Sequence, residues 1–153
     1  MKNKKLTFFQ TFNAMRIFLS MYFDKHRSSD LGIILSSLRL FKDKSNWKEN
    51  PTTWDPAAWE DWMDGVEKTL YDLGIQKNSK EIDYTPWVAF LCMKNYLQLF
   101  YDEISYEIIG EILVLLNSVK ENSVNNIVWF DWLTAINHAI NETYELDEPL
   151  SNS

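Results

Sequence analysis

The residue types that most often carry out chemistry are few in this sequence. It has one cysteine, Cys92, and two histidines, His26 and His138. A catalytic thiol needs a nearby base, and metal or acid–base chemistry needs several such groups together. The sequence also contains no glycine-rich phosphate loop, no HExxH or CxxC motif and no nucleophile elbow. We therefore expect no enzyme, no cofactor and no metal site, and we interpret Cys92, which lies in an apolar stretch, as a core residue.

Carboxylates are the reactive groups that the sequence arranges most regularly. Glu103, Glu107 and Glu111 recur every four residues, and Asp102 precedes the first of them. On a helix this spacing brings side chains close to one line, so these residues predict a negative stripe that binds a basic partner. The alternative is that the acids only interact favourably with a helix N-terminus, which explains Glu107 better than Glu111.

A second candidate for recognition is the segment from Phe41 to Trp54. It carries Trp47, together with Asp43 and Glu49. A loop tryptophan that stays outside the core is a typical anchor of a protein interface. We predict that Trp47, Asp43 and Glu49 contact a partner. The alternative is that the tryptophans fold back over the helices.

The net charge of −7 is unevenly distributed along the chain. Residues 1–74 hold 11 Lys/Arg and 10 Asp/Glu, a net charge of +1, whereas residues 75–153 hold 4 and 12, a net charge of −8. A strongly acidic half disfavours nucleic acid, because the phosphates repel it. It favours a basic protein partner, although ordinary solubility would also account for the charge.

An internal repeat indicates which elements position these residues. An offset of 78 aligns the first part of the chain with a later part, and the matched pairs include Thr7/Thr85, Phe12/Phe90, Met15/Met93, Leu19/Leu97, Asp24/Asp102, Gly32/Gly110, Ile34/Ile112 and Leu38/Leu116. An offset of 70 then aligns Trp59, Asp61 and Trp62 with Trp129, Asp131 and Trp132. The identities fall in order, which indicates a duplicated unit.

Each copy has the pattern of three helices. Apolar residues recur at spacings of three and four, and residues suited to the N-cap lie near the helix starts. In the first copy the starts are at Thr7, near Ser28-Ser29-Asp30 and at Asp55; in the second they are at Thr85, near Ser105 and at Asn125 or Asn126. We predict an all-α fold, with two tandem copies of a three-helix unit packed into one compact domain over residues 1–153. The repeats are 7–74 and 85–144.

Three shared features have predicted structural roles. Gly32 and Gly110 favour a close helix crossing over a ligand contact, because a glycine inside a helix costs about 1 kcal/mol relative to alanine. The pairs Trp59/Trp62 and Trp129/Trp132 have core spacing, although an aromatic ligand box is the alternative. An ion pair of Arg16 with Asp61, and of Lys94 with Asp131, predicts that the Asp61→Asn change destabilises the fold.

The sequence also predicts where the protein resides. Gln10, Asn13 and Arg16 interrupt the apolar stretch near the N-terminus, so it does not resemble a signal peptide. No run approaches the roughly 18 apolar residues of a membrane-spanning helix. We expect a cytoplasmic protein that does not contact a membrane.

The first copy resembles a known family. The segments Ser29-Asp30-Leu31-Gly32 and Asp55-Pro56-Ala57-Ala58-Trp59-Glu60-Asp61-Trp62 are similar to those of small bacterial immunity proteins from contact-dependent growth inhibition and other polymorphic toxin systems. The similarity covers roughly residues 7–70, and the second copy departs from it, with Asn126-Ile127-Val128-Trp129-Phe130-Asp131-Trp132.

The resemblance implies that the protein binds the C-terminal domain of a cognate toxin and occludes its active site. That domain is commonly a nuclease, and a nuclease surface is basic because it grips phosphate. An acidic inhibitor fits such a partner, so we expect a ribonuclease toxin. A small-ligand-binding helical domain, with an aromatic pocket between the repeats, is the alternative.

Overall fold

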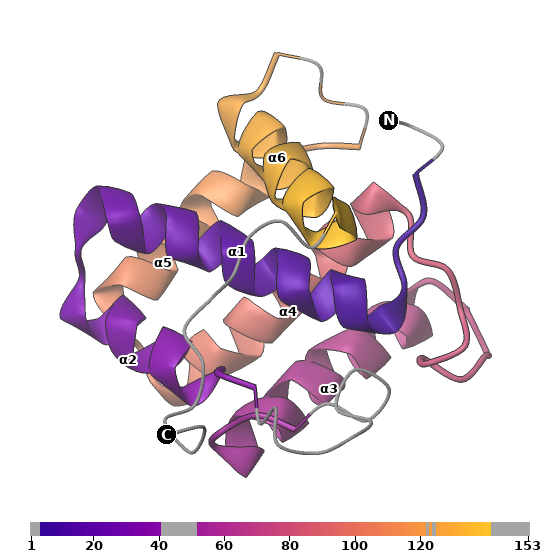
Figure 1. Ribbon diagram of the computed structural model, residues 1–153, viewed down its shortest axis with the longest axis horizontal. Helices are drawn as coiled ribbons and strands as arrows, with labels where there is room; N and C mark the ends of the chain where they lie inside the picture. The colour runs from indigo at the N-terminus through magenta and orange to yellow at the C-terminus, as the bar shows by residue number, and fades with distance from the viewer. Residues whose placement is uncertain (1–3, 41–51, 122, 124, 142–153) are drawn as a thin grey trace.

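A computed structural model describes residues 4–40, 52–121, 123 and 125–141. Within these residues the chain forms six helices (Figure 1), which are α1 (Phe8–His26), α2 (Ser29–Ser37), α3 (Pro56–Asp72), α4 (Pro86–Glu103), α5 (Glu107–Asn117) and α6 (Ile127–Asn141). Extended pairing in the same residues is limited to two isolated bridges, Leu6 with Tyr84 and Leu40 with Thr53. The prediction of an all-α fold is confirmed.

Most of the predicted helix starts are confirmed, because they depend on local side chains. Thr7 and Thr85 cap α1 and α4 through their hydroxyls, and Asp55 caps α3 by accepting a hydrogen bond from the Ala57 amide. Asn126 accepts from the amides at the start of α6. α5 is the exception, since its N-cap residue, Tyr106, offers no capping side chain.

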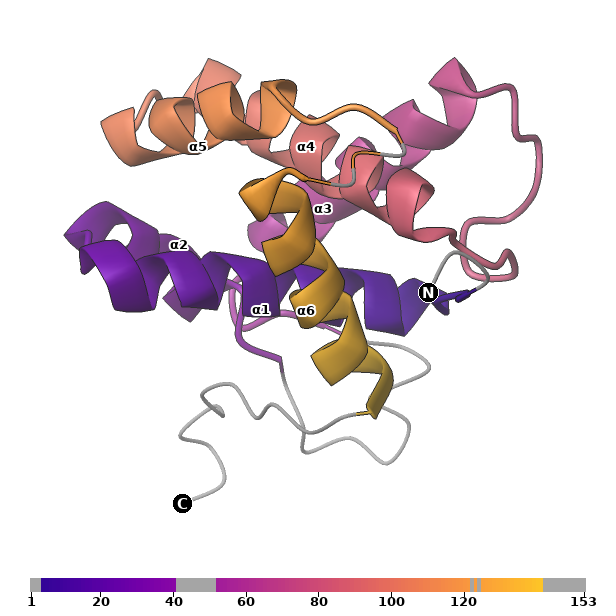
Figure 2. The ribbon, with the colours of Figure 1, turned by 90° about the horizontal axis from the view of Figure 1, so that it is seen from above.

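The helices pair across the two halves of the chain. The most extensive helix contacts join α3 to α4 and α1 to α6, so the third helix of each half packs on the first helix of the other. Figure 2 shows α4 and α5 lying over α1 and α2, with α6 crossing α1. The buried side chains of both halves form one hydrophobic core.

Two fully buried tryptophans occupy corresponding places in this core. The Trp62 ring contacts Phe12 of α1 and Tyr96 of α4, at centroid distances of 5.6 and 5.9 Å. The Trp132 ring contacts Phe90 of α4 and Phe18 of α1, at 6.0 and 5.9 Å.

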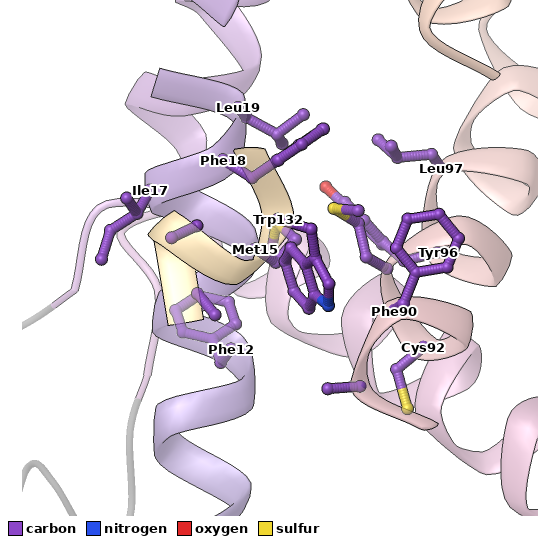
Figure 3. Packing of buried hydrophobic residues seen from close by; sticks show 14 of the residues in the cluster. Phe12, Met15, Ile17, Phe18, Leu19, Phe90, Cys92, Tyr96, Leu97 and Trp132 are labelled. Atoms are coloured by element: carbon purple, nitrogen blue, oxygen red, sulfur yellow. The ribbon is translucent and has the colours of Figure 1, made fainter. Parts of the chain in front are cut away.

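Figure 3 shows Trp132 between the side chains of α1 and α4. The offset of 78 matches Phe12 with Phe90 and Phe18 with Tyr96, so the two contact sets correspond. Trp59 and Trp129 are partly buried against the same core. The interpretation of the tryptophan pairs as core residues is confirmed.

Three glycines lie at positions where neighbouring helices leave little room for a side chain. A Cβ atom on Gly32 would lie 3.1 Å from the Phe23 ring, and one on Gly110 would lie 3.0 Å from the Tyr101 ring. Each glycine therefore packs against an aromatic ring of the preceding helix. Gly65 of α3 is tighter, because a Cβ atom there would lie 2.8 Å from the backbone of Tyr96 on α4. Sequence reasoning did not single out Gly65.

The crossing at Gly65 leads to a stability prediction. In the Gly65→Ala variant, the added methyl group meets backbone atoms that cannot rotate away, so α3 and α4 must separate. Alanine would gain about 1 kcal/mol of helix propensity, but overpacking should outweigh this and lower the unfolding free energy by about 2 kcal/mol or more. Urea denaturation followed by circular dichroism measures the change.

The matched control is Ala135→Gly at the corresponding position of α6. It should lower the unfolding free energy by about 1 kcal/mol through helix propensity and by about 1 kcal/mol more because the Ala135 methyl group is buried, without any steric clash. A Gly65→Ala protein as stable as the original would contradict the close crossing.

The two buried indoles differ in one respect that stability measurements can detect. Trp132 Nε1 donates a hydrogen bond to the Pro86 carbonyl at 2.9 Å, whereas Trp62 Nε1 has no hydrogen-bond partner. Trp132→Phe and Trp62→Phe leave similar cavities, but only the first loses a hydrogen bond, and the second removes an unpaired buried donor. Trp132→Phe should therefore be less stable than Trp62→Phe by about 1 to 2 kcal/mol. Equal losses in chemical denaturation would argue against this difference.

Candidate acidic interface

Carboxylates from two helices meet where the start of α3 lies beside the end of α4. The two helices run antiparallel. The Asn95 side-chain amide donates to Thr69 Oγ1 at 2.8 Å, and Gly65 packs on Tyr96. Further along the same pair of helices, the charge of Glu103 at the end of α4 raises the pKa of Asp61 on α3.

Asp61 lies at the centre of this group of charges. Burial raises the pKa of its carboxyl group above the ordinary value, and the neighbouring carboxylates add to the increase; in order of effect they are Glu103, Asp64, Asp55 and Glu60. Among the residues that the structure describes, no positive charge contributes to this increase in pKa and none forms an ion pair with Asp61. We call Asp55, Glu60, Asp61, Asp64 and Glu103 the acidic face.

The corresponding place in the other half holds a cation. Asp131 of α6 accepts from Lys25 at the end of α1, with 3.5 Å between Oδ2 and Nζ. The Lys25 ammonium group also lies over the Tyr22 ring, 5.6 Å from its centroid. The offsets match Asp131 with Asp61 and Lys25 with Glu103, so a lysine on one side is replaced by a glutamate on the other.

The predicted ion pairs of Arg16 with Asp61 and of Lys94 with Asp131 are wrong. Asp131 pairs with Lys25 instead, and the Arg16 guanidinium lies over the Phe12 ring at 5.7 Å. The reason is the exchange of helices between the halves. Because α3 and α6 pack on the first helix of the other half, each aspartate faces the end of that helix and not the middle of its own.

The predicted stripe residues all lie on the surface. Asp102 and Glu103 end α4, and Glu107 and Glu111 occupy the first turns of α5, after a turn at residues 104–106. None of the four pairs with a basic side chain in the described part of the chain. The charge of Glu103 also raises the pKa of Asp61 on α3. That the four form one binding stripe stays a prediction.

The structure adds four residues that sequence reasoning did not propose for recognition, namely Asp55, the N-cap of α3, and Glu60, Asp61 and Asp64 within α3. The available signal was the offset of 78, which sets Glu103 against Lys25. Trp47, Asp43 and Glu49, the candidates from the long loop, lie outside the described residues.

Apolar side chains extend the surface beside the glutamates of α5. Val114 is 70% exposed, and Leu115 and Ile104 are also exposed. Val114 and Leu115 follow Glu111 by three and four residues, so they lie on the same side of the helix. The outward side of α5 therefore combines negative charge with apolar area, as protein interfaces often do.

The remaining candidate groups have structural surroundings. Cys92 is fully buried, and burial raises the pKa of its thiol to about 12, which keeps it protonated at neutral pH. This agrees with the interpretation of Cys92 as a core residue. Across residues 4–40, 52–121, 123 and 125–141, no group of three or more His, Cys, Asp or Glu side chains is arranged to hold a metal ion.

None of the helices that the structure describes combines the length and apolar character needed to cross a bilayer. Comparison with protein-family models, with curated proteins and with solved structures finds no match to this chain. The resemblance to immunity proteins therefore rests on the sequence segments around the starts of α2 and α3.

An ion pair of Asp61 would make the Asp61→Asn change destabilising. The carboxylates that act on Asp61 predict the opposite effect. With its pKa raised in the folded state, ionised Asp61 opposes folding, so stability falls as the pH rises from the unfolded-state pKa, near 3.8, through the folded-state value. The Asp61→Asn variant should therefore have a higher melting temperature than the original at pH 7. The gain should shrink as the pH is lowered through that window.

The matched change is Asp131→Asn, which removes the ion pair with Lys25. It should leave the melting temperature at pH 7 unchanged or slightly lower, because the Lys25 side chain is 55% exposed and exposed pairs contribute little. Differential scanning calorimetry from pH 4 to 7 compares both variants. A lower melting temperature for Asp61→Asn at pH 7 would contradict the absence of an ion pair.

Proposed function

We propose that this chain is an immunity protein that acts in the cytoplasm. It binds the C-terminal domain of a cognate toxin, a basic ribonuclease, and covers its active site without chemistry of its own. The observation that carries the proposal is the acidic face, the partly buried Asp61 with four carboxylates acting on it and no balancing cation from the described residues. The similarity of the segments around α2 and α3 to immunity proteins supports the same role.

A surface of this kind suits a ribonuclease because of the enzyme's own chemistry. A ribonuclease must attract and hold phosphates, so its active site is lined with basic side chains. A carboxylate-rich protein presents similar charges in a fixed arrangement and competes for the same groups. Long-range attraction also increases the association rate, which matters for an inhibitor that must act before the toxin damages the cell.

The exposed side of α5 would enlarge this contact. Glu107 and Glu111 continue the negative charge beyond Glu103, and Val114 and Leu115 add apolar area next to it. Apolar area buried at the centre of an interface contributes affinity, and charges around it contribute specificity and association rate. In this proposal both components belong to one binding surface.

We also propose that the two halves are copies of one ancestral three-helix unit. The support is the correspondence of contacts. Trp62 and Trp132 meet matching aromatic partners, and Gly32 and Gly110 lie under matching rings. In the alternative function, an aromatic pocket between the halves binds a small ligand. It has less support, because Trp62 and Trp132 are fully buried against these rings.

The proposed function predicts a toxin gene beside the gene for this protein, and the test uses the C-terminal domain of that toxin. Co-expression should restore growth to cells that produce the domain, and calorimetry should detect a complex. Glu103, Glu107 and Glu111 replaced together by lysine should weaken binding about tenfold or more, because attraction becomes repulsion. The loss should grow as the salt concentration falls.

The control replaces three other exposed glutamates, Glu67, Glu81 and Glu121, by lysine, which gives the same change in net charge. Its affinity should fall much less. If both triple variants lose affinity equally, only net charge matters and the surface is not the site. If the unaltered protein does not bind the toxin domain, the proposed function is wrong.

A further inference from the structure

The helix α5 presents two adjacent apolar side chains to solvent. It packs on the core through four buried side chains, which are Ile109, Ile112, Leu113 and Leu116. Val114 and Leu115 lie on the opposite side of the helix, 70% and 40% exposed, in line with the exposed Glu107 and Glu111. In Figure 2 this helix lies along the upper edge of the molecule, with α1 and α2 below it.

The other half of the chain shows that the scaffold does not require these apolar side chains. The offset of 78 matches Val114 with Ser36 and Leu115 with Ser37, on the corresponding helix α2. Serine at both positions is therefore compatible with the same packing. Contiguous exposed apolar side chains mark interaction sites more often than isolated ones do. We therefore interpret this pair as part of a binding surface.

The charges along the same side of α5 restrict what can cover it. Glu107 and Glu111 occupy its first turns and the apolar pair follows, so this side is negative at its N-terminal end and apolar at its C-terminal end. A second copy of the chain does not match this pattern. Two antiparallel α5 helices would cover the glutamates of one with the apolar pair of the other, and two parallel ones would set glutamate against glutamate. The pattern requires a different protein, with positive charge at one end of the covering element.

We propose that the outward side of α5 binds an amphipathic helix of the partner, antiparallel to α5. This partner helix carries lysine or arginine in its C-terminal turns and apolar side chains in the turns before them. The inference rests on the proposed function, in that the partner is a basic protein. The antiparallel order places the partner's basic end beside Glu107 and Glu111, and its apolar turns on Val114 and Leu115.

The dipoles of the two helices favour the antiparallel order. The N-terminal end of α5 carries partial positive charge, which stabilises its own glutamates, and the C-terminal end of any helix carries partial negative charge, which stabilises cations. A partner helix with its basic residues at the C-terminal end is therefore stable by itself, and its dipole opposes that of α5. In the parallel order the partner's basic residues would lie at its N-terminal end, where the dipole opposes them.

The first arm of the test uses a designed peptide as the probe, at low salt concentration. It is an alanine-based peptide of about 20 residues, held helical by a hydrocarbon staple, with leucines in its first turns and lysines in its last. NMR of the backbone amides should locate its binding on α5. A spin label at its N-terminus should broaden the amide signal of Ser118 more than that of Glu107. A stapled peptide of the reverse order, with lysines first, should bind about threefold more weakly.

Three results of this arm overturn the inference. They are no binding to the original protein, binding at a surface other than α5, and equal affinity of the two peptides. Stronger broadening at Glu107 than at Ser118 overturns it too, because it places the peptide parallel to α5.

The second arm removes the apolar pair. Val114→Ser with Leu115→Ser introduces the residues of α2 and should weaken peptide binding about tenfold. The matched control is Ile127→Ser with Phe130→Ser on α6, where the two side chains are 68% and 64% exposed. It should leave the affinity nearly unchanged. Circular dichroism checks that both variants keep the fold, and an equal loss of affinity in both overturns the inference.

The toxin domain separates this inference from the proposed function. Val114→Ser with Leu115→Ser should weaken toxin binding about tenfold, whereas the control on α6 should not. Toxin binding that is unaffected by the change on α5 keeps the proposed function and removes the inference. Antiparallel peptide binding on α5 without toxin binding removes the proposed function and keeps the helix-binding surface.

Discussion

The close crossing of α3 on α4 is the constraint on which the rest of the structure depends. Gly65 brings α3 within direct contact of the Tyr96 backbone, and α6 packs on α1 in the corresponding way. Because each third helix packs on the first helix of the other half, neither half encloses a separate core. Trp62 and Trp132 each bridge both first helices, so the aromatic packing of the whole protein follows from these two crossings.

The packing of each third helix on the other half also determines which charged residues lie close together. Asp61 and Asp131 occupy matching places on α3 and α6, but each faces the end of a helix from the other half. One helix end supplies Lys25 and the other supplies Glu103. The ring contacts of the two tryptophans therefore match, while the charges at these two helix ends differ. Among the described residues, Asp131 has a lysine partner and Asp61 has only carboxylates acting on it.

Local signals in the sequence predicted the helices, but not how they pair. Thr7, Thr85, Asp55 and Asn126 cap helices through atoms a few residues away, so their roles follow from sequence spacing. The partner of Asp61 was predicted wrongly, because packing α3 within its own half or on the other half buries the same tryptophans. Gly65 has no glycine counterpart in the second half, where Ala135 stands, so comparison of the halves did not single it out. Its role depends on the distance between two backbones, which no pattern in the sequence encodes.

The position of the acidic face links stability to binding. Asp61 lies on α3 between Asp55, at the helix start, and Gly65, at the crossing, so its charge acts close to the packing that holds the two halves together. These carboxylates, which no cation of the described residues balances, oppose folding. A mutation that removed them would stabilise the free protein. Natural proteins commonly retain such unfavourable groups where function requires them. A basic partner would relieve the same repulsion that the free protein tolerates, so the interaction that weakens the free protein is also the one that would strengthen the complex.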